Sequence, residues 1–339
     1  MRFPVPRGRL LALVDALAGR RLVVAGDFVL DRFVYGHPKR ISREAPVLIL
    51  RFSREENLPG GAGNTAANVR ALGGVPVPLG ATGPDEAGRA LRDAFGARGI
   101  ETDGLVETPG YETPTKTRIL GGAPHAIKQQ IVRYDVEDVL PESAARGEEF
   151  AARLRAAARG AHGAILSDYG YGAVSPEAVP VLRAALAPGA RVCVDSRHRL
   201  PAYAGVDAAT PNEEELEESA GGPLDSDAKL DAAGAALRAR MGCGSLLVTR
   251  GSRGMALFSG GSAPERIPVH GTDQVADVTG AGDTVLAAFA LALAAGATPL
   301  EAALLANFAG GVVVMKMGTA VVTPEELKAA VDADRALLS

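Results

Sequence analysis

The amino-acid sequence predicts an α/β fold in which a doubly wound, mostly parallel sheet lies between two layers of helices. Short runs that are apolar at every position are typical of parallel strands buried on both faces. Such runs occupy residues 22–25, 164–166, 192–194 and 246–249. Alanine-rich segments between these runs fit the crossover helices that connect parallel strands. These segments lie near residues 150–158, 177–187 and 228–240.

Two stretches, 33–52 and 113–135, break this alternation because they read as strands with no helix between them. The second contains the pair Gly121-Gly122, which is a turn signal between alternating flanks. We therefore expect one domain over residues 1–339 with a small inserted β-sheet that serves as a lid or as a contact between subunits. The apolar residues 47–50 would be exposed on such a sheet, which favours a homodimer.

The composition excludes several classes of protein. The formal net charge is −4 and the pI is near 5.8, so the chain has no basic character suited to nucleic acid. The N-terminal segment lacks the apolar core of a signal peptide, and the apolar run at 285–295 is shorter than the roughly 20 residues that span a bilayer. Cys193 and Cys243 form no CxxC pair. We expect a soluble protein of the cytoplasm.

The most specific motif is DVTGAGDT at residues 277–284, directly before an apolar segment that predicts a buried helix. The small residues Gly280, Ala281 and Gly282 allow the backbone to approach an anion closely. Unpaired N–H groups at the helix start favour a phosphate there. Asp283 would then accept the proton of an attacking hydroxyl. The alternative interpretation is a glycine-rich turn with Asp283 as a charge at a helix N-terminus.

Two further clusters are candidates for binding the acceptor. Gly60, Gly61 and Asn64 open a second predicted helix, where backbone amides and the Asn64 side chain could hold sugar hydroxyls or a phosphate. A plain helix start explains them equally well. Asp27 ends the first predicted strand and Asp31 follows it. Ligands bind at the carboxyl ends of parallel strands, although a turn or capping role competes for Asp27.

A third element, Asn212 with Glu215, places two polar side chains three residues apart on one predicted helix face. They could hold a hydrated Mg²⁺ near nucleotide phosphates, and a capped acidic helix start is the competing interpretation. The sequence has no GxxxxGK[ST] motif, which excludes a P-loop kinase. It also has no GxGxxG followed by an acid about 20 residues later, which disfavours a dinucleotide-dependent oxidoreductase.

Taken in this order, the motifs resemble those of the ribokinase-like, or PfkB, carbohydrate kinases. The resemblance covers nearly the whole chain and rests on the glycine pair near residue 60, NxxE at 212–215 and DxTGAGD at 277–283. It implies ATP as the phosphoryl donor, Mg²⁺ as the metal, and an anion hole formed by residues 280–282 beside the base Asp283. The sequence does not decide whether a monovalent cation such as K⁺ binds near the anion hole. The expected ATP-binding residues are Asn212, Thr249, Gly251, Thr279 and Asn307, and the expected metal ligand is Glu215.

A narrower set of motifs looks like those of the heptose 7-phosphate kinases of lipopolysaccharide precursor synthesis, in the form without a fused nucleotidyltransferase. The stretches GDFVLDR at 26–32, RISREAPV at 40–47 and TKTR at 115–118 carry this likeness. It implies transfer of phosphate to the anomeric hydroxyl of heptose 7-phosphate. Lys116 and Arg118 are then candidates for binding the acceptor phosphate, because a phosphate dianion needs cationic contacts.

The chain departs from this likeness at two positions. Tyr171 stands where the likeness leads us to expect Lys, and Ser196-Arg197 replaces an expected Pro-Lys. A kinase for another sugar or for a nucleoside, such as ribose, fructose or adenosine, therefore remains an alternative within the family. A non-catalytic sugar sensor is a further alternative, which the intact glycine run and Asp283 disfavour.

Overall fold

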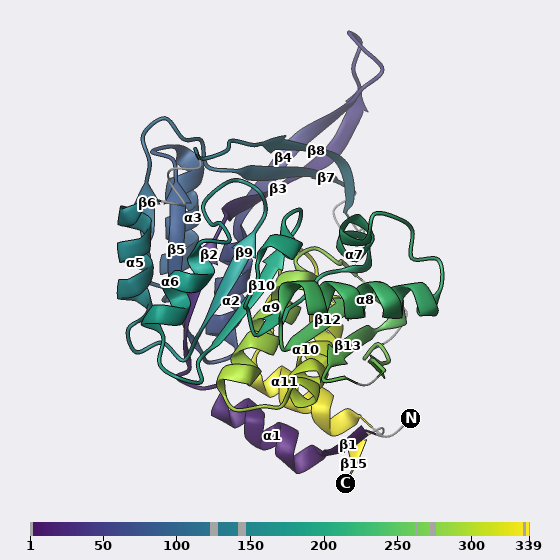
Figure 1. The fold of residues 1–339 in the computed structure, drawn as a ribbon. Helices are drawn as coiled ribbons and strands as arrows, with labels where there is room; N and C mark the ends of the chain where they lie inside the picture. The colour runs from purple at the N-terminus through teal and green to yellow at the C-terminus, as the bar shows by residue number, and fades with distance from the viewer. Residues whose placement is uncertain are drawn as a thin grey trace.

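A computed structural model describes residues 3–122, 128–141, 147–261, 263–271, 276–334 and 337–338. Within these ranges the core is a nine-stranded sheet with the order β14-β13-β12-β11-β10-β9-β2-β5-β6 (Figure 1). Its strands are β2 (Arg21–Gly26), β5 (Val75–Thr82), β6 (Leu105–Glu107), β9 (Gly163–Asp168), β10 (Arg191–Ser196), β11 (Ala208–Ala209), β12 (Ser245–Thr249), β13 (Met255–Ser259) and β14 (Glu265–Ile267). All neighbours from β12 to β6 are parallel, whereas β13 and β14 pair antiparallel at one edge. The mostly parallel sheet predicted from the sequence is confirmed.

Helices cover both faces of this sheet, and each face has its own hydrophobic cluster. One layer contains α1 (Arg7–Ala16), α2 (Ala62–Ala71), α3 (Glu86–Gly96), α9 (Ala281–Ala294), α10 (Pro299–Val313) and α11 (Pro324–Ala333). The other contains α5 (Glu148–Ala158), α6 (Ala178–Ala185), α7 (Glu213–Ala220) and α8 (Asp227–Met241). Short 3-10 helices lie at η1 (Leu200–Ala202) and η2 (Gly251–Arg253), and the terminal strands β1 (Phe3–Pro6) and β15 (Leu337–Leu338) pair with each other.

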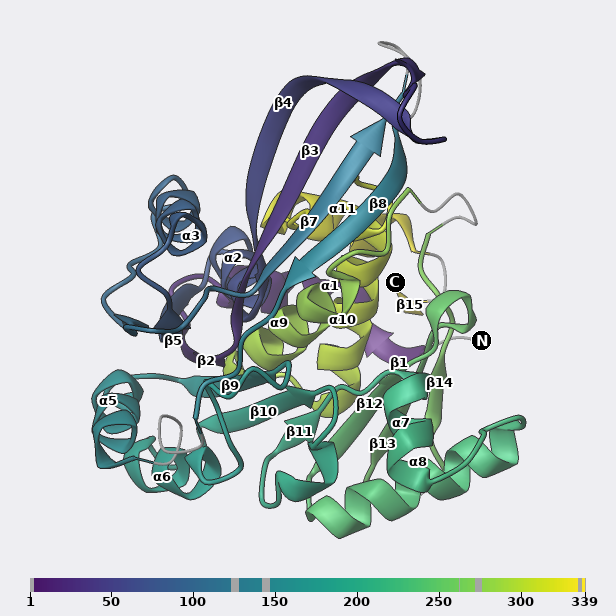
Figure 2. The ribbon, with the colours of Figure 1, turned by 90° about the horizontal axis from the view of Figure 1, so that it is seen from above.

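A second sheet stands apart from the core and is called the lid sheet below (Figure 2). Its four strands have the order β4-β3-β7-β8. They are β3 (Phe28–Ile41), β4 (Leu48–Gly61), β7 (Thr115–Gly121) and β8 (Gln129–Val136). The predicted stretches 33–52 and 113–135 fall in these strands, and β3 and β4 extend further toward the core than the sequence indicates. The connection from β7 to β8 includes residues 123–127, which lie outside the described residues.

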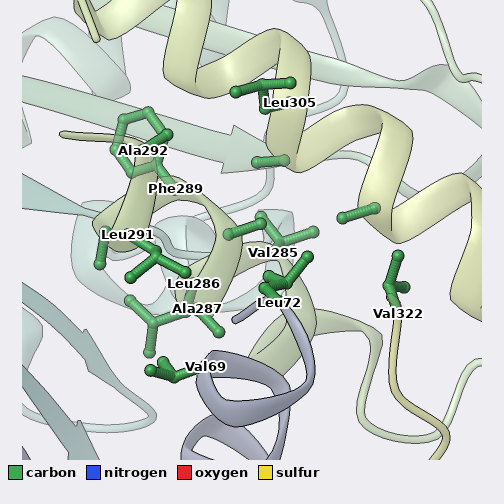
Figure 3. Close-up of a cluster of buried hydrophobic side chains, with 14 of the residues drawn as sticks. Val69, Leu72, Val285, Leu286, Ala287, Phe289, Leu291, Ala292, Leu305 and Val322 are labelled. Atoms are coloured by element: carbon green, nitrogen blue, oxygen red, sulfur yellow. The ribbon is translucent and has the colours of Figure 1, made fainter. Parts of the chain in front are cut away.

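Helix α9 is the central helix of the molecule, as its apolar sequence predicts. Every residue from Asp283 to Ala292 is buried. Val285 and Leu286 belong to the same hydrophobic cluster as Val69 of α2 and Leu72, which directly follows that helix (Figure 3). Helix α9 contacts both α2 and the adjacent α10, and these contacts fix its place in the helix layer.

Two helices near the C-terminus begin at a Thr-Pro pair followed by Glu. Thr298 and Thr323 each form a capping box, with Glu301 and Glu326 respectively three residues later. Both cysteines are buried as free thiols. Within the described ranges, no helix has the length and apolar character needed to cross a membrane.

Candidate active site

The first turn of α9 is an open helix start built from small residues. Gly280 has a φ of +74°, in the left-handed region that favours glycine, and a Cβ there would clash with the Asn64 side chain. A Cβ on Gly282, in contrast, would meet no atom within 4 Å. No side chain caps the helix, so the backbone N–H groups of Gly282 and Asp283 have no intrahelical partner, whereas that of Ala281 donates to the Val278 carbonyl at 3.2 Å. This combination of space, free N–H groups and helix dipole suits an anion.

Asp283 lies in that first turn and is almost completely buried. Its Oδ1 accepts hydrogen bonds from the Tyr169 hydroxyl at 2.8 Å and from the Thr65 hydroxyl at 3.3 Å. Its Oδ2 accepts one from the Asn64 side-chain amide at 2.9 Å. Side chains from two other elements, α2 and the segment after β9, therefore orient the carboxylate.

Burial raises the pKa of Asp283 to about 6, although the hydrogen bonds from Asn64, Tyr169 and Thr65 oppose the shift. The nearby carboxylate of Asp31 contributes to the increase. A carboxyl group with this pKa is ionised at neutral pH and takes up a proton more readily than an exposed aspartate. These are the properties of a general base.

Beside this helix start lies a mainly apolar cavity of about 310 Å³. Its lining includes three of the predicted ATP-binding residues, Thr249, Gly251 and Asn307. It also includes Ala281 and Gly282 of the predicted anion hole. The apolar residues of its wall were not predicted from the sequence as part of a binding site. They include Met255, Val269, Val278, Val285 and Val314. An apolar cavity that ends at an anion-binding helix start suits a nucleotide, whose base is planar and whose phosphates are charged.

Asn212 and Glu215 form a capping box at the start of α7, with each side chain bonded to the other residue's backbone N–H at 2.9 Å. Asn212 also pairs with Thr249 through an isolated β-bridge, which places it next to the wall of the cavity. Asn212 and Glu215 therefore form the capped helix start that was the competing interpretation of this pair. Thr279, the remaining predicted ATP-binding residue, lines a different cavity of about 190 Å³ that faces the lid sheet.

The structure brings Asp195 close to Glu215. Burial raises the pKa of Asp195 well above its ordinary value, with the charges of Glu215 and Asp283 acting in the same direction. The Oδ1 atom of Asp195 is buried and has no hydrogen-bond partner. Among the described residues, no cluster of three or more His, Cys, Asp or Glu side chains could hold a metal. Two neighbouring carboxylates, one of which has an oxygen without a partner, nevertheless fit Mg²⁺, which keeps several waters and binds phosphate oxygens.

Asp27 organises the loop after β9 rather than presenting an open carboxylate. Its oxygens accept hydrogen bonds from the backbone N–H groups of Tyr169 at 2.8 Å, Tyr171 at 3.0 Å and Ala173 at 2.8 Å. Burial raises its pKa to about 6 despite these bonds. Asp27 therefore lies at the predicted edge of the sheet, where it holds the segment that carries Tyr169 in place.

Asp31 and Arg118 form a buried ion pair at 2.5 Å between neighbouring strands of the lid sheet. A Cβ on Gly60 would clash with the Asp31 carboxylate, so glycine at this position makes room for the pair. Gly61 has a φ of +56° and ends β4 immediately before α2. The glycine pair thus allows close packing between the lid sheet and the first turn of α2, where Asn64 lies.

Lys116 connects the lid sheet to the core. Its Nζ donates to the Tyr171 hydroxyl at 3.1 Å and to Asp135 at 3.3 Å. The Tyr171 hydroxyl in turn donates to Glu137 at 2.7 Å. The residue that replaces the expected Lys at position 171 thus contacts a lysine supplied by the lid.

Four residues of this site were not chosen as site residues from the sequence: Thr65, Tyr169, Asp195 and Arg197, although Arg197 was noted as the replacement of an expected Lys. Tyr169 and Asp195 lie at the carboxyl ends of the parallel strands β9 and β10, which is the position that could have revealed them. The Arg197 guanidinium lies over the Tyr169 ring, 5.5 Å from its centroid. Thr65 carried no separate signal because a hydroxyl in the first turn of a helix is common.

The fold and this site suit a class of enzymes that place a phosphate-bearing ligand against a helix start beside a buried carboxylate. Residues 20–326 match the pfkB family of carbohydrate kinases, and the chain belongs to this family. Curated relatives include the bifunctional protein HldE of Gluconacetobacter diazotrophicus, 41% identical over 92% of this chain and 63% of its own. HldE of Caulobacter vibrioides is 43% identical over 94% of this chain and 64% of its own. The chain thus spans less than two thirds of the length of these relatives.

Solved structures share the fold at lower sequence identity. A ribokinase from Arabidopsis thaliana superposes with a TM-score of 0.72 at 22% identity and covers 94% of this chain and 100% of its own. Phosphofructokinase-2 from Escherichia coli gives a TM-score of 0.72 at 19% identity and covers 93% of this chain and 98% of its own. The predicted ribokinase-like architecture, a mostly parallel sheet with a small separate sheet, is confirmed.

Proposed function

We propose that this protein transfers the γ-phosphoryl group of ATP to a hydroxyl group of a sugar phosphate, with heptose 7-phosphate as the best-supported acceptor. The observation that carries the proposal is the position of Asp283. Its buried carboxylate lies in the first turn of α9, and the adjacent residue Gly282 lines the nucleotide-sized cavity. Identity of about 40% to proteins named HldE supports the choice of a heptose acceptor.

In the proposed reaction, the acceptor hydroxyl gives its proton to Asp283 while its oxygen forms a bond to the γ-phosphorus of ATP. The bond between that phosphorus and the oxygen bridging to the β-phosphate breaks, and ADP leaves with the bonding electrons. Asn64 and Thr65 hold the carboxylate in position, and backbone N–H groups at the start of α9 stabilise the charge on the transferred group. Burial in the first turn of α9 keeps most water away from the base.

The donor and metal sites follow from the same geometry. The apolar cavity with Asn307 in its wall suits the adenine, and the ribokinase that shares this fold was solved with ribose and ATP. Asp195 and Glu215 would hold Mg²⁺ through carboxylate oxygens and water. When bound, the metal would neutralise charge on the phosphate oxygens.

The acceptor phosphate fits the inner face of the lid sheet. Arg118, Lys128 and Gln130 line the cavity of about 190 Å³ between this face and the loop that carries Thr279. Lys116 lies two residues from Arg118, on the same face of β7. Since Arg118 already pairs with Asp31, a phosphate there would share the guanidinium with a carboxylate.

A second candidate is a kinase of the same family that acts on another sugar or nucleoside. The specific observation behind it is Tyr171, whose aromatic ring and hydroxyl occupy a position where the heptose kinases are expected to have a lysine. Such a change alters both the charge and the shape at the acceptor side of the site.

The test is ATP-dependent ADP release measured with heptose 7-phosphate, heptose, fructose 6-phosphate, ribose and adenosine. Heptose 7-phosphate is expected to give the highest kcat/KM. Preference for another acceptor would support the second candidate, and ADP release that no acceptor stimulates would contradict both. The Lys116→Met variant and the paired Asp31→Asn/Arg118→Met variant should raise KM for the phosphorylated heptose more than for heptose itself. Equal losses for both sugars would argue against phosphate binding at the lid.

We also propose that the protein is a homodimer through the outer face of the lid sheet. Val132, Ile119 and Val34 lie opposite one another on neighbouring strands, and their side chains therefore share one face. The next row, with Arg118 and Phe33, points to the other face, toward Asp31 and the site. An apolar row on the face directed away from the core suits a second copy of the same chain.

A further inference from the structure

Tyr169 lies at the centre of the site, although it was not among the predicted site residues. Its hydroxyl donates to Oδ1 of Asp283 at 2.8 Å, which is shorter than the 3.3 Å bond from Thr65 to the same oxygen. Its backbone N–H donates to Asp27. A Cβ on Gly61 would come within 3.4 Å of its ring, and Arg197 lies over that ring.

We propose that Tyr169 is a positioning residue for the phosphoryl-transfer reaction: its hydroxyl orients the Asp283 carboxylate and keeps it ionised. This inference rests on the proposed function, because it gives Tyr169 a role in preparing the general base. Tyr169 acts through Asp283 and forms no bond to substrate in this proposal.

The geometry explains why the hydroxyl is well placed for this role. Four contacts hold the residue: Asp27 fixes its backbone, Gly61 gives its ring space, Arg197 covers the ring, and the hydroxyl is bonded to Asp283. A side chain held at both ends loses little further entropy when its hydroxyl donates. The bond from Tyr169 occupies Oδ1, and Asn64 occupies Oδ2. Because Thr65 also donates to Oδ1, the lone pair left for the proton of an acceptor hydroxyl is on Oδ2.

The hydroxyl of Tyr169 acts only as a donor in this pair. Burial and the neighbouring carboxylates raise the pKa of Tyr169 well above its ordinary value, so the phenol keeps its proton. A neutral donor beside a buried carboxylate favours the ionised form of that carboxylate. Removing the hydroxyl should therefore raise the pKa of Asp283.

Several other charged groups face Asp283 and Tyr169, and they set the background of any titration. Asp31 on β3 raises the pKa of Asp283, and Asp195 on β10 lies close enough to interact with it. Arg197 acts in the opposite direction on Tyr169. On α2, the partners Asn64 and Thr65 are neutral. All of these groups remain when Tyr169→Phe removes one oxygen atom, so the variant isolates the contribution of the hydroxyl.

The test is a pH titration of Asp283 by NMR on protein labelled with ¹³C at aspartate Cγ, with the signal assigned by its loss in Asp283→Asn. In Tyr169→Phe the midpoint should move to higher pH by about one unit, the effect of losing one hydrogen bond to a charged group. Tyr203→Phe is the matched control, because the Tyr203 hydroxyl donates to a different buried carboxylate, Asp168, at 2.8 Å. It should leave the Asp283 midpoint unchanged.

Activity gives a second readout. With the acceptor that the wild-type enzyme prefers, Tyr169→Phe should lower kcat about 10-fold or more at pH 7, shift the acidic limb of the profile to higher pH, and leave KM for ATP nearly unchanged. If Tyr169→Phe does not fold, 3-fluorotyrosine at position 169, a stronger donor, should lower the midpoint instead. An unchanged midpoint in whichever variant folds would overturn the proposal. A shifted midpoint in a protein that phosphorylates no acceptor would overturn the proposed function alone.

Discussion

The side-chain amide of Asn64 lies 2.9 Å from Oδ2 of Asp283 and 3.1 Å from the carbonyl oxygen of Gly280. A single amide group therefore joins the helix that follows the first glycine motif to the helix start of the second. The two residues are 219 positions apart in the sequence. Asn64 was predicted to bind the acceptor, and the structure gives it a direct contact with the candidate base.

This contact predicts that two substitutions at position 64 raise the Asp283 pKa to different extents, because the Asn64 amide lowers that pKa. Asn64→Asp places a second carboxylate beside Asp283, which should raise the Asp283 pKa and move the acidic limb of kcat/KM to higher pH. Asn64→Ala removes one donor and should lower kcat without adding charge. Asn57→Asp, which adds the same charge on the lid strand β4, is the control. If Asn64→Asp and Asn57→Asp gave the same profile, the contact would have no role in setting the base.

Asp283→Asn should lower kcat by about 10² to 10⁴, the usual contribution of a general base. The protein should still fold, because an asparagine can accept from Asn64 and donate to the hydroxyls of Tyr169 and Thr65. Its Tm at pH 8 should equal or exceed that of the wild type, since the substitution removes a buried charge. Turnover is measured by coupled ADP release and Tm by circular dichroism. Turnover close to that of the wild type would remove Asp283 from the mechanism.

The pKa of Asp283 also predicts how activity depends on pH. Its folded-state pKa is raised from 3.8 to about 6, so the carboxyl is protonated and inactive as a base below that value. The kcat/KM of the wild type should therefore fall as the pH decreases through about 6. Asp27 has the same value, and its protonation would loosen the loop that carries Tyr169, which should make the decline steeper than a single titration. A flat profile down to pH 5 would contradict this assignment.

The raised pKa values of Asp27 and Asp283 also predict how the free energy of unfolding changes with pH. Between pH 3.8 and 6 the folded state binds protons at Asp27 and Asp283 that the unfolded state has already lost. These two groups therefore favour the folded state less as the pH rises through that window. Burying two carboxylates is thus a cost in stability at neutral pH, which is typical of groups retained for function.

The two glycines of the α9 start should respond differently to alanine. Gly282→Ala is expected to fold normally, because its Cβ meets open space, and to raise KM for ATP, because the methyl group fills the anion site. Gly280→Ala should lower stability by about 1–2 kcal/mol or more, since an alanine at positive φ is strained and here also clashes with Asn64. Thermal unfolding and ATP kinetics separate the two outcomes. A normal KM for ATP in Gly282→Ala would show that the phosphates lie elsewhere.

Sequence reasoning succeeded where a local pattern decides the structure. The buried strands, the helix α9 and the capping boxes at Thr298 and Thr323 follow from short-range periodicity and side-chain chemistry. It was less complete where distant segments meet. The contact of Tyr169 with Asp283 and the position of Asp195 near Glu215 depend on which strands are neighbours in the sheet, and no local pattern encodes that order.

The exposed apolar row on the lid sheet leads to the last prediction. Val132 is 47% exposed and Tyr134, two residues along the same strand, is 52% exposed, so the outer face of β8 is not covered within one chain. Val132→Glu should convert a dimer to a monomer in light scattering at micromolar concentration, because it would place charges in the centre of the interface. Val139→Glu, at a position outside the lid sheet that is 61% exposed, is the matched control. A wild-type protein that is already monomeric at that concentration would exclude the interface.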